Sequence, residues 1–429
     1  MQKKIKNLLK ELFPLNRSLS GPHNLKTLKI LKKDLPLKIK KIKTGTKVFD
    51  WKIPKVWHFK SAQLIDLKTN SILIDSKNSN LHVMTNSRKI NKIFKWTDLK
   101  NHLFYSNKSS AIPYRTTYYD DNWGLCVTKE QYLNIKNSKG PFKIIIDSSF
   151  KDGFMHYGEL LLKGKSKKEI LVSTYICHPS LANDNLSGII VTHILAQYLL
   201  NKINRYYSYR IVFHPETIGA VAYAKINENK LKDIDFGTVI TCTGGKENFS
   251  YKKSFDNDHF INNLINKLFK TKKIPHKVHK FDVVGSDERQ YSSQAFKINI
   301  VSIFKGKYYE YPNYHLSTDN LSYVKSENIL KSINLHKDFI NLIENTPIYK
   351  INKTECEIML SKYNLYSKIG GGFNYNKNKI VDQHLILWLL FLLNGKNTLE
   401  MIADKLNVKI SRIKSFCNIL KNKKLIYRV

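Results

Sequence analysis

The apolar positions in the middle of the chain alternate between strand-like and helix-like spacing. Continuous apolar runs of strand length are separated by longer segments in which apolar residues recur every three or four positions. The predicted strands cover residues 169–177, 209–213, 237–243 and 298–304, and the predicted helices cover 186–200, 218–226, 259–269 and 323–344. Strands that alternate with helices in this way predict an α/β fold with a doubly wound, mostly parallel sheet.

The N-terminal third of the chain has a different pattern. Two helix-like segments, 5–13 and 25–31, precede short β-rich runs from 47 to 82, which predict a small β unit. Residues 83–140 are irregular and rich in aromatic residues, and Arg115 lies among them. We interpret this stretch as a pocket wall in which Arg115 binds substrate, because an isolated arginine usually has an anionic partner. A small aromatic core is the alternative. Two further strands are predicted at 142–146 and 154–162.

Residues 355–429 form a separate predicted unit. Three short helical patterns and a terminal strand follow one another at 385–393, 398–406, 411–421 and 424–429. This succession, ending in a predicted hairpin, is typical of a winged-helix domain. The third helix is basic but contains a single arginine, so we favour an interaction or lid module and leave DNA binding open as the alternative.

The chain is long enough, at 429 residues, for two or three domains that each bury a core. The patterns predict an α/β domain built from residues 1–45 and 113–350. A β-rich domain is inserted at 46–112, and the winged-helix domain covers 355–429.

The net charge of the chain at first suggests a nucleic-acid or anionic-membrane partner, but the kind of basic residue weakens that suggestion. The formal net charge is +38, yet only eight of the 72 basic residues are arginine. Phosphate and base recognition favours the bidentate guanidinium, whereas lysines spread evenly along a chain indicate a solvated surface.

The five cysteines and the apolar runs bear on the compartment. Cysteines at 126, 177, 242, 356 and 417 form no C-x-x-C pair, which favours a reducing compartment over a disulfide scaffold. The longest apolar run, 385–393, is far shorter than the roughly 18 residues of a membrane span. The N-terminal segment is amphipathic and unlike a signal peptide. These features predict a cytoplasmic protein with no membrane partner, and they leave a homo-oligomer open.

Ligand-type residues gather in four clusters at the ends of predicted strands. His178 and Asp184 follow the first strand, His214 and Glu216 follow the second, the loop 285–291 precedes the last strand, and His315 comes after it. The carboxyl ends of parallel strands meet at one edge of a sheet, where ligands bind. Imidazole and carboxylate together suit zinc or a similar metal, and a further carboxylate can act as general base.

Each of these residues also has a structural interpretation. Asp184 and Glu216 could cap the helices that follow them, His178 could be a buried core histidine, and we take His214 as structural. The convergence of four clusters on one sheet favours a functional site.

The motif D-N-L-S-G, residues 184–188, resembles the D-N-x-S-G signature of the zinc aminopeptidases of the leucyl-aminopeptidase and glutaminyl-cyclase superfamily. The whole chain resembles a bacterial group of aminopeptidase-like proteins with an inserted β domain and a C-terminal winged helix, often linked to polysaccharide biosynthesis. The resembling stretches are N-R-S-L-S-G, K-V-F-D-W-K-I-P, I-P-Y-R-T-T-Y-Y, C-H-P-S-L-A-N-D-N-L-S-G, P-E-T-I-G, G-S-D-E-R-Q-Y and Y-H-L-S-T-D-N-L.

The resemblance implies that His178, Asp184 and His315 bind metal, with Asp184 able to bridge two ions. Three departures favour one zinc ion over two. Ser180 replaces the aspartate of H-x-D, Pro215 replaces the first of two glutamates, and the position of a later acidic ligand holds Gly244 and Gly245. We assign Glu216 as the general base, with a ligand role as the close alternative and Glu288 as the reserve base.

The resemblance therefore implies a metal-dependent hydrolase that acts on an amide or peptide bond of a small-molecule or peptide-like substrate, in polysaccharide or amino-sugar metabolism. The predicted substrate-binding residues are Arg115, Asp287, Glu288, Arg289 and Tyr291. The alternative is a degenerate peptidase fold that binds a ligand and acts as a regulator through its winged helix.

Overall fold

The computed structural model describes residues 1–108, 110–365 and 377–429, without the side chains of 377–382. The chain divides into two compact units. Unit 1 consists of Met1–Phe255 and Lys272–Lys337, and unit 2 consists of Asp256–Thr271 and Asp338–Val429. Among the described residues, no helix combines the length and apolarity that a membrane crossing requires.

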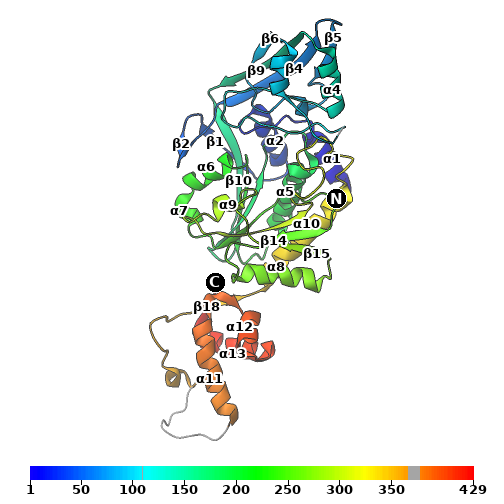
Figure 1. Ribbon diagram of the computed structural model, residues 1–429. Coiled ribbons are helices and arrows are strands. Elements are labelled where there is room, and N and C mark those ends of the chain that lie inside the picture. Colours follow the sequence, from blue (N-terminus) through cyan, green and yellow to red (C-terminus); the bar gives the residue numbers. More distant parts are fainter. Residues whose placement is uncertain (109, 366–376) are drawn as a thin grey trace. The chain divides into compact units, whose positions relative to one another are not determined.

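An eight-stranded sheet forms the centre of unit 1 (Figure 1). Its four central strands are parallel, and the flanking strands β10 and β14 each pair antiparallel with them. This arrangement confirms the predicted α/β fold with a mostly parallel central sheet. In spatial order the strands are β1 (Lys38–Lys43), β10 (Phe154–Leu162), β12 (Ser208–His214), β11 (Glu169–Tyr175), β13 (Phe236–Val239), β16 (Asn299–Lys305), β14 (Phe249–Lys252) and β15 (His276–His279).

Helices pack on the sheet through faces that the sequence leaves apolar. Leu171 of β11, Val212 of β12 and Ile300 of β16 share one core with α6, and that core also contains Tyr291. The helix after β11, α5, is buried along most of its length, as expected of a helix that is apolar nearly all round. The helices of unit 1 are α1 (Gln2–Leu12), α2 (Pro22–Lys32), α3 (Trp96–Leu99), α4 (Lys129–Ser138), α5 (Gly188–Asn201), α6 (Ile218–Ile226), α7 (Glu228–Leu231), α9 (Glu288–Tyr291) and the first part of α10 (Ser326–Asn345).

A second, four-stranded antiparallel sheet covers its own apolar core in unit 1. Its order is β5 (Ser71–Asp75), β4 (Val56–Asp66), β9 (Phe142–Lys151) and β6 (Ile90–Phe94), with the sheet at the top of Figure 1. The strands predicted at 142–146 and 154–162 both form, but they lie in different sheets: β9 pairs with β4 and β6, and β10 pairs with β1 and β12. Short strand pairs complete the unit: β2 (Lys47–Val48) with β3 (Trp51–Lys52), and β7 (Leu103–Phe104) with β8 (Leu125–Cys126).

The order of the central strands creates a switch point at β11. The chain runs from β11 through α5 to β12 on one side, and then through α6 and α7 to β13 on the other side of β11. Loops that leave neighbouring parallel strands in opposite directions are where α/β sheets bind ligands. The segments after β11, β12 and β13 begin at this point.

Unit 2 contains, among its described residues, a three-stranded sheet, the second part of α10 and four further α-helices. Strand β17 (Ile348–Ile351) lies between β18 (Asn394–Thr398) and β19 (Ile426–Arg428), so the terminal strand pairs with β17 and forms no hairpin with its sequence neighbours. The helices are α8 (Phe260–Thr271), α11 (Lys377–Leu392), α12 (Leu399–Leu406), which Thr398 caps, and α13 (Ile410–Asn422). Residues 366–376 of the predicted winged-helix domain lie outside the described residues, and the three-domain division stays a prediction.

Candidate metal centre

Three predicted ligands converge at the switch point. Asp184 Oδ2 lies 3.0 Å from His315 Nε2 and 3.8 Å from His178 Nε2. One ligand atom from each of these residues lies within 4.8 Å of the others. His178 and Asp184 are buried, whereas 28% of the His315 side chain is exposed, so the cluster has an open side at His315.

The segment after β11 is built to hold Asp184. The Asn185 side chain donates hydrogen bonds to Thr174 Oγ1 and to the carbonyl of Tyr175, which fasten the turn to the end of the strand. Gly188 begins α5 so close to β13 that a Cβ there would stand 2.5 Å from the carbonyl oxygen of Ile240. The asparagine and glycine of D-N-L-S-G therefore have packing roles beside Asp184.

Electrostatics keep the two buried predicted ligands, His178 and Asp184, in protonation states that suit metal binding. Burial lowers the pKa of His178 to about 4, so its imidazole is neutral at pH 7. Burial alone would raise the pKa of Asp184, but the charges of His178 and His315 and hydrogen bonds, including one from the Tyr175 hydroxyl, bring it to about 2. A neutral imidazole and an ionised carboxylate are the forms that bind a cation.

The donor set fits a cation. His315 Nε2 is buried and makes no hydrogen bond, although Asp184 Oδ2 is only 3.0 Å away. A buried nitrogen without a hydrogen-bond partner is costly in a folded protein unless another group uses its lone pair. Two imidazoles and a carboxylate are the three protein ligands of a catalytic zinc site that leaves a fourth position open.

Glu216 lies beside this cluster. Its Oε2 is 3.8 Å from His178 Nε2, and its Oε1 accepts a hydrogen bond of 2.9 Å from the Ser286 hydroxyl. Burial, together with the negative charges of Asp287 and Asp184, raises the pKa of Glu216 well above its usual range. A fifth of the Glu216 side chain, 21%, is exposed.

The Cys177 sulfur contacts both the predicted ligand His178 and the candidate base Glu216. Cys177 Sγ accepts the backbone N–H of Glu216 at 3.2 Å and lies 3.4 Å from His178 Nδ1. A metal-binding histidine usually donates its second ring N–H to a neighbouring acceptor, which fixes the ring. Nothing in the sequence pattern distinguishes this cysteine from a core cysteine.

Gly244 and Gly245, which stand where the two-metal pattern has an acidic ligand, are closely surrounded by other residues. A Cβ on Gly244 would stand 2.8 Å from Ser187 Cβ and 2.8 Å from Val324 Cγ1. A Cβ on Gly245 would stand 2.4 Å from the carbonyl oxygen of Lys305. Neither position has room for an acidic side chain.

His214 is fully buried and bonded within the core. Its Nε2 lies 2.9 Å from Ser173 Oγ and 2.7 Å from the Tyr291 hydroxyl, and its Nδ1 lies 2.9 Å from the Pro215 carbonyl. Asp287 Oδ1 accepts the backbone N–H of Thr217 at 2.8 Å. These contacts fix the Pro215–Thr217 turn that carries Glu216.

The predicted substrate-binding residues divide by exposure. Asp287, Glu288 and Tyr291 are fully buried, so a substrate does not reach them in this conformation. Glu288 forms an ion pair of 3.1 Å with Lys252, which is also buried. Arg289 and Arg115 are exposed. The substrate contacts of these five residues stay predictions.

Aromatic rings surround the open side of the cluster. The ring of Tyr314 stacks on His315 with a centroid distance of 3.9 Å, and Tyr114 lies 5.0 Å from the same imidazole. Tyr309, which is 61% exposed, contacts Tyr314 at 4.9 Å. Burial raises the pKa of Tyr118 to about 12, and the charge of Glu216 contributes to the same shift.

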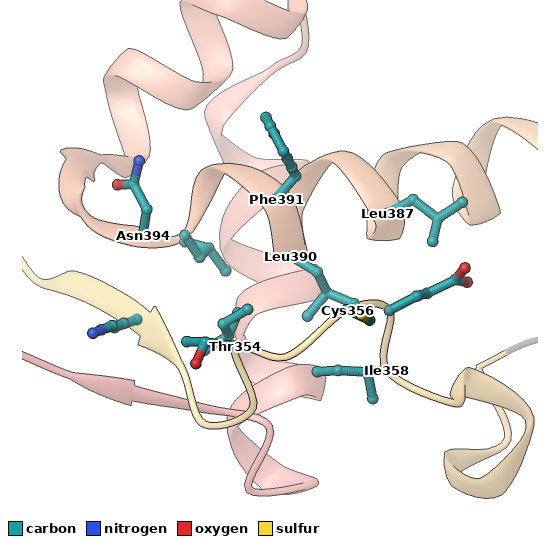
Figure 2. A pocket seen from close by; sticks show the side chains of 11 residues that line it. Thr354, Cys356, Ile358, Leu387, Leu390, Phe391 and Asn394 are labelled. Carbon is teal, nitrogen blue, oxygen red and sulfur yellow. The ribbon is translucent and has the colours of Figure 1, made fainter.

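Unit 2 contains a separate cavity of about 520 Å³ (Figure 2). The lining comes from α11, with Leu387, Leu390 and Phe391, and from the segment with Thr354, Cys356 and Ile358, toward which the Leu390 side chain points. Among the described residues that line it, Glu357 is the one carboxylate and there is no histidine. It therefore lacks the set of groups found in unit 1.

Comparison with known proteins places this site in a family. A family model described as a domain of unknown function, DUF4910, matches residues 6–346. The chain belongs to this family. A protein of Clostridium acetobutylicum, described as a polysaccharide biosynthesis protein with an aminopeptidase-like domain, is 38% identical over 411 residues, or 96% of this chain and 93% of the relative.

Solved structures show the same fold in DUF4910 and in zinc aminopeptidases. A crystal structure of a C. acetobutylicum protein described as a peptidase has a TM-score of 0.80 at 36% identity, covering 100% of this chain and 96% of that one. A zinc aminopeptidase of Bacillus subtilis has a TM-score of 0.55 at 13% identity, over 79% of this chain and 93% of that one. The predicted family resemblance and aminopeptidase-like fold are confirmed.

Proposed function

We propose that the chain is a metal-dependent hydrolase that cleaves an amide or peptide bond with one zinc ion. The observation that carries the proposal is the convergence of His178, Asp184 and His315, with an unbonded His315 Nε2, at the switch point of an aminopeptidase-like sheet. The zinc aminopeptidases that share this fold support the choice of metal.

The residues of the chain would divide the work as follows. His178, Asp184 and His315 hold the ion, which when bound supplies Lewis acidity and lowers the pKa of water. Glu216 Oε2 takes the proton from the attacking water and passes it to the leaving nitrogen. Ser286 holds Oε1 by a hydrogen bond of 2.9 Å, which leaves Oε2 for this transfer.

One ion is favoured over two because the chain lacks room for a second ligand set. Gly244 and Gly245 are closed in by Ser187, Val324 and the Lys305 carbonyl, and Pro215 has no carboxylate. Glu216 as a fourth ligand is the close alternative to Glu216 as base, since its Oε2 lies 3.8 Å from His178 Nε2.

The substrate we propose is an amide in which a ring or other flat group lies next to the bond that is cleaved. The exposed rings of Tyr118 and Tyr309 beside the site offer faces for stacking. The C. acetobutylicum relative is named for polysaccharide biosynthesis, which supports an amino-sugar amide as well as a peptide.

A second candidate is a protein that binds such a ligand without cleaving it. Pro215 at the position of a classical base favours it. In that case the ligand would signal through unit 2, and steeply salt-dependent binding to duplex DNA would support it.

Chelation separates the two candidates. The wild-type chain, stripped of metal and given back one equivalent of zinc, should regain hydrolysis of aminoacyl anilides or of N-acetylated amino sugars. Hydrolysis that is indifferent to chelator, or ligand binding without hydrolysis at any zinc level, would contradict the hydrolase.

A further inference from the structure

Three successive backbone N–H groups before and at Asp184 point to a single residue, Asp319. The Ala182 N–H donates to the Asp319 carbonyl at 2.9 Å, the Asn183 N–H to Oδ1 at 2.7 Å, and the Asp184 N–H to Oδ2 at 3.0 Å. Consecutive N–H groups that converge in this way form an anion-binding concavity, and here a side-chain carboxylate fills it.

Asp319 is itself held rigidly and without access to solvent. Its exposed fraction is 0%, and Oδ2 also accepts a hydrogen bond of 2.9 Å from the Tyr311 hydroxyl. The Asp319 N–H donates to the Leu316 carbonyl at 2.9 Å, which closes a turn directly after His315. The same turn therefore carries one predicted ligand, His315, and accepts a hydrogen bond from the backbone of another, Asp184.

We propose that Asp319 is a positioning residue for the metal centre: it fixes Asp184 relative to His315 so that the ligand atoms are in place before a cation binds. The inference rests on the proposed metal site. It assigns Asp319 no contact with metal or substrate. The Asp319 carboxylate lies in one buried cluster with Asp184, and both of its oxygens are bonded there: two backbone N–H groups and the Tyr311 hydroxyl donate to them.

The gain lies in preorganisation. An aspartate on a free turn would have to be ordered when the ion binds, and the backbone entropy lost in that ordering would weaken binding. Residues that orient a ligand typically contribute 10–100-fold to metal affinity. We therefore expect zinc affinity to fall in that range when the Asp319 carboxylate is removed.

The test uses the full chain as wild type, Asp319→Asn and, as matched control, Tyr311→Phe. The asparagine keeps the shape of the side chain but presents an N–H₂ group to one of the two backbone donors. The control removes the tyrosine hydroxyl and leaves every backbone bond in place. Affinity for Zn²⁺ is measured by competition with a chelator, and thermal unfolding of the metal-free proteins shows whether the fold is kept.

We expect Asp319→Asn to bind zinc about 10–100-fold more weakly at a similar melting temperature, and Tyr311→Phe to lose much less. Wild-type affinity in Asp319→Asn would overturn the proposal. If the asparagine variant does not fold, Asp319→Glu, which keeps the charge but displaces it by one methylene, takes its place with the same reading.

Hydrogen exchange keeps this test separate from the proposed function. In the metal-free Asp319→Asn protein, hydrogen exchange should be faster than in wild type for the peptide that covers residues 182–187. Unchanged exchange would overturn the proposal that Asp319 holds this segment. If the wild type binds no zinc, the hydrolase proposal fails, and this exchange measurement alone decides whether Asp319 holds the turn.

Discussion

Asp184 Oδ2 and His315 Nε2 lie 3.0 Å apart at the end of the central sheet, with no hydrogen bond made by the histidine nitrogen. Asp184 precedes β13 in the sequence, and His315 follows β16. A cation bound by both residues would require their ligand atoms to lie close together in this way.

Replacing Glu216 with glutamine separates its two candidate roles. A glutamine cannot accept the proton from water, so we expect hydrolysis to fall about 10²–10⁴-fold while zinc remains bound. Activity is measured with the amide substrate, and zinc by elemental analysis. Loss of the ion together with activity would make Glu216 a ligand. The matched change Glu228→Gln, at the start of α7, should alter neither.

An acidic residue at Gly244 should not restore a second metal ion. A Cβ there would stand 2.8 Å from Ser187 Cβ and from Val324 Cγ1, so Gly244→Asp forces these side chains apart. Overpacking of this kind costs about 1–3 kcal/mol, which should appear as a lower melting temperature. Gly244→Ala should show most of the same loss. A stable Gly244→Asp protein with two ions per chain would refute the argument for one.

Cys177 should act through its two neighbours. Cys177→Ala removes the acceptor for the Glu216 N–H and the neighbour of His178 Nδ1, 3.2 Å and 3.4 Å away. We expect zinc affinity to fall about 10-fold and activity with it. Cys177→Ser retains an acceptor and should lie between wild type and alanine. Identical affinities for all three proteins would show that the sulfur does not orient the histidine.

Stability should fall in weak acid because His336 is buried. Burial lowers the pKa of His336 to about 4, whereas an unfolded histidine titrates near 6.5. The unfolded chain therefore binds the extra proton between these pH values, and stability is lost as the pH falls from about 6.5 to 4. The loss from pH 7 to pH 5 is about 2 kcal/mol. Denaturant unfolding of wild type and His336→Gln should show a smaller pH slope in the variant; equal slopes would contradict this.

The sequence predicts the strands and the helix at the edge of the sheet that carries the candidate ligands, because these elements follow local rules. The strands that end before His178 and His214 and the helix of residues 218–226 are read from apolar spacing alone, and the structure has them at β11, β12 and α6. Parallel strands then bring their ends together without further information.

Features that depend on distant contacts could not be read in this way. β14 and β15 are four residues long, with polar and charged residues between their apolar ones, and were not predicted. β9 joins the small sheet through β4 and β6, a choice that local spacing does not specify. Asp319 looks like an ordinary turn residue until its carboxylate is seen beside Asn183 and Asp184.

The central claim is that His178, Asp184 and His315 hold one ion. The most direct measurement is the metal content of the chain purified without added zinc, beside His178→Ala, His315→Ala and the control His58→Ala, a histidine of β4 outside the site. The account predicts one ion per chain in wild type and in the control, and none in the other two variants. A metal-free wild type, or an ion that persists in both His178→Ala and His315→Ala, would contradict it.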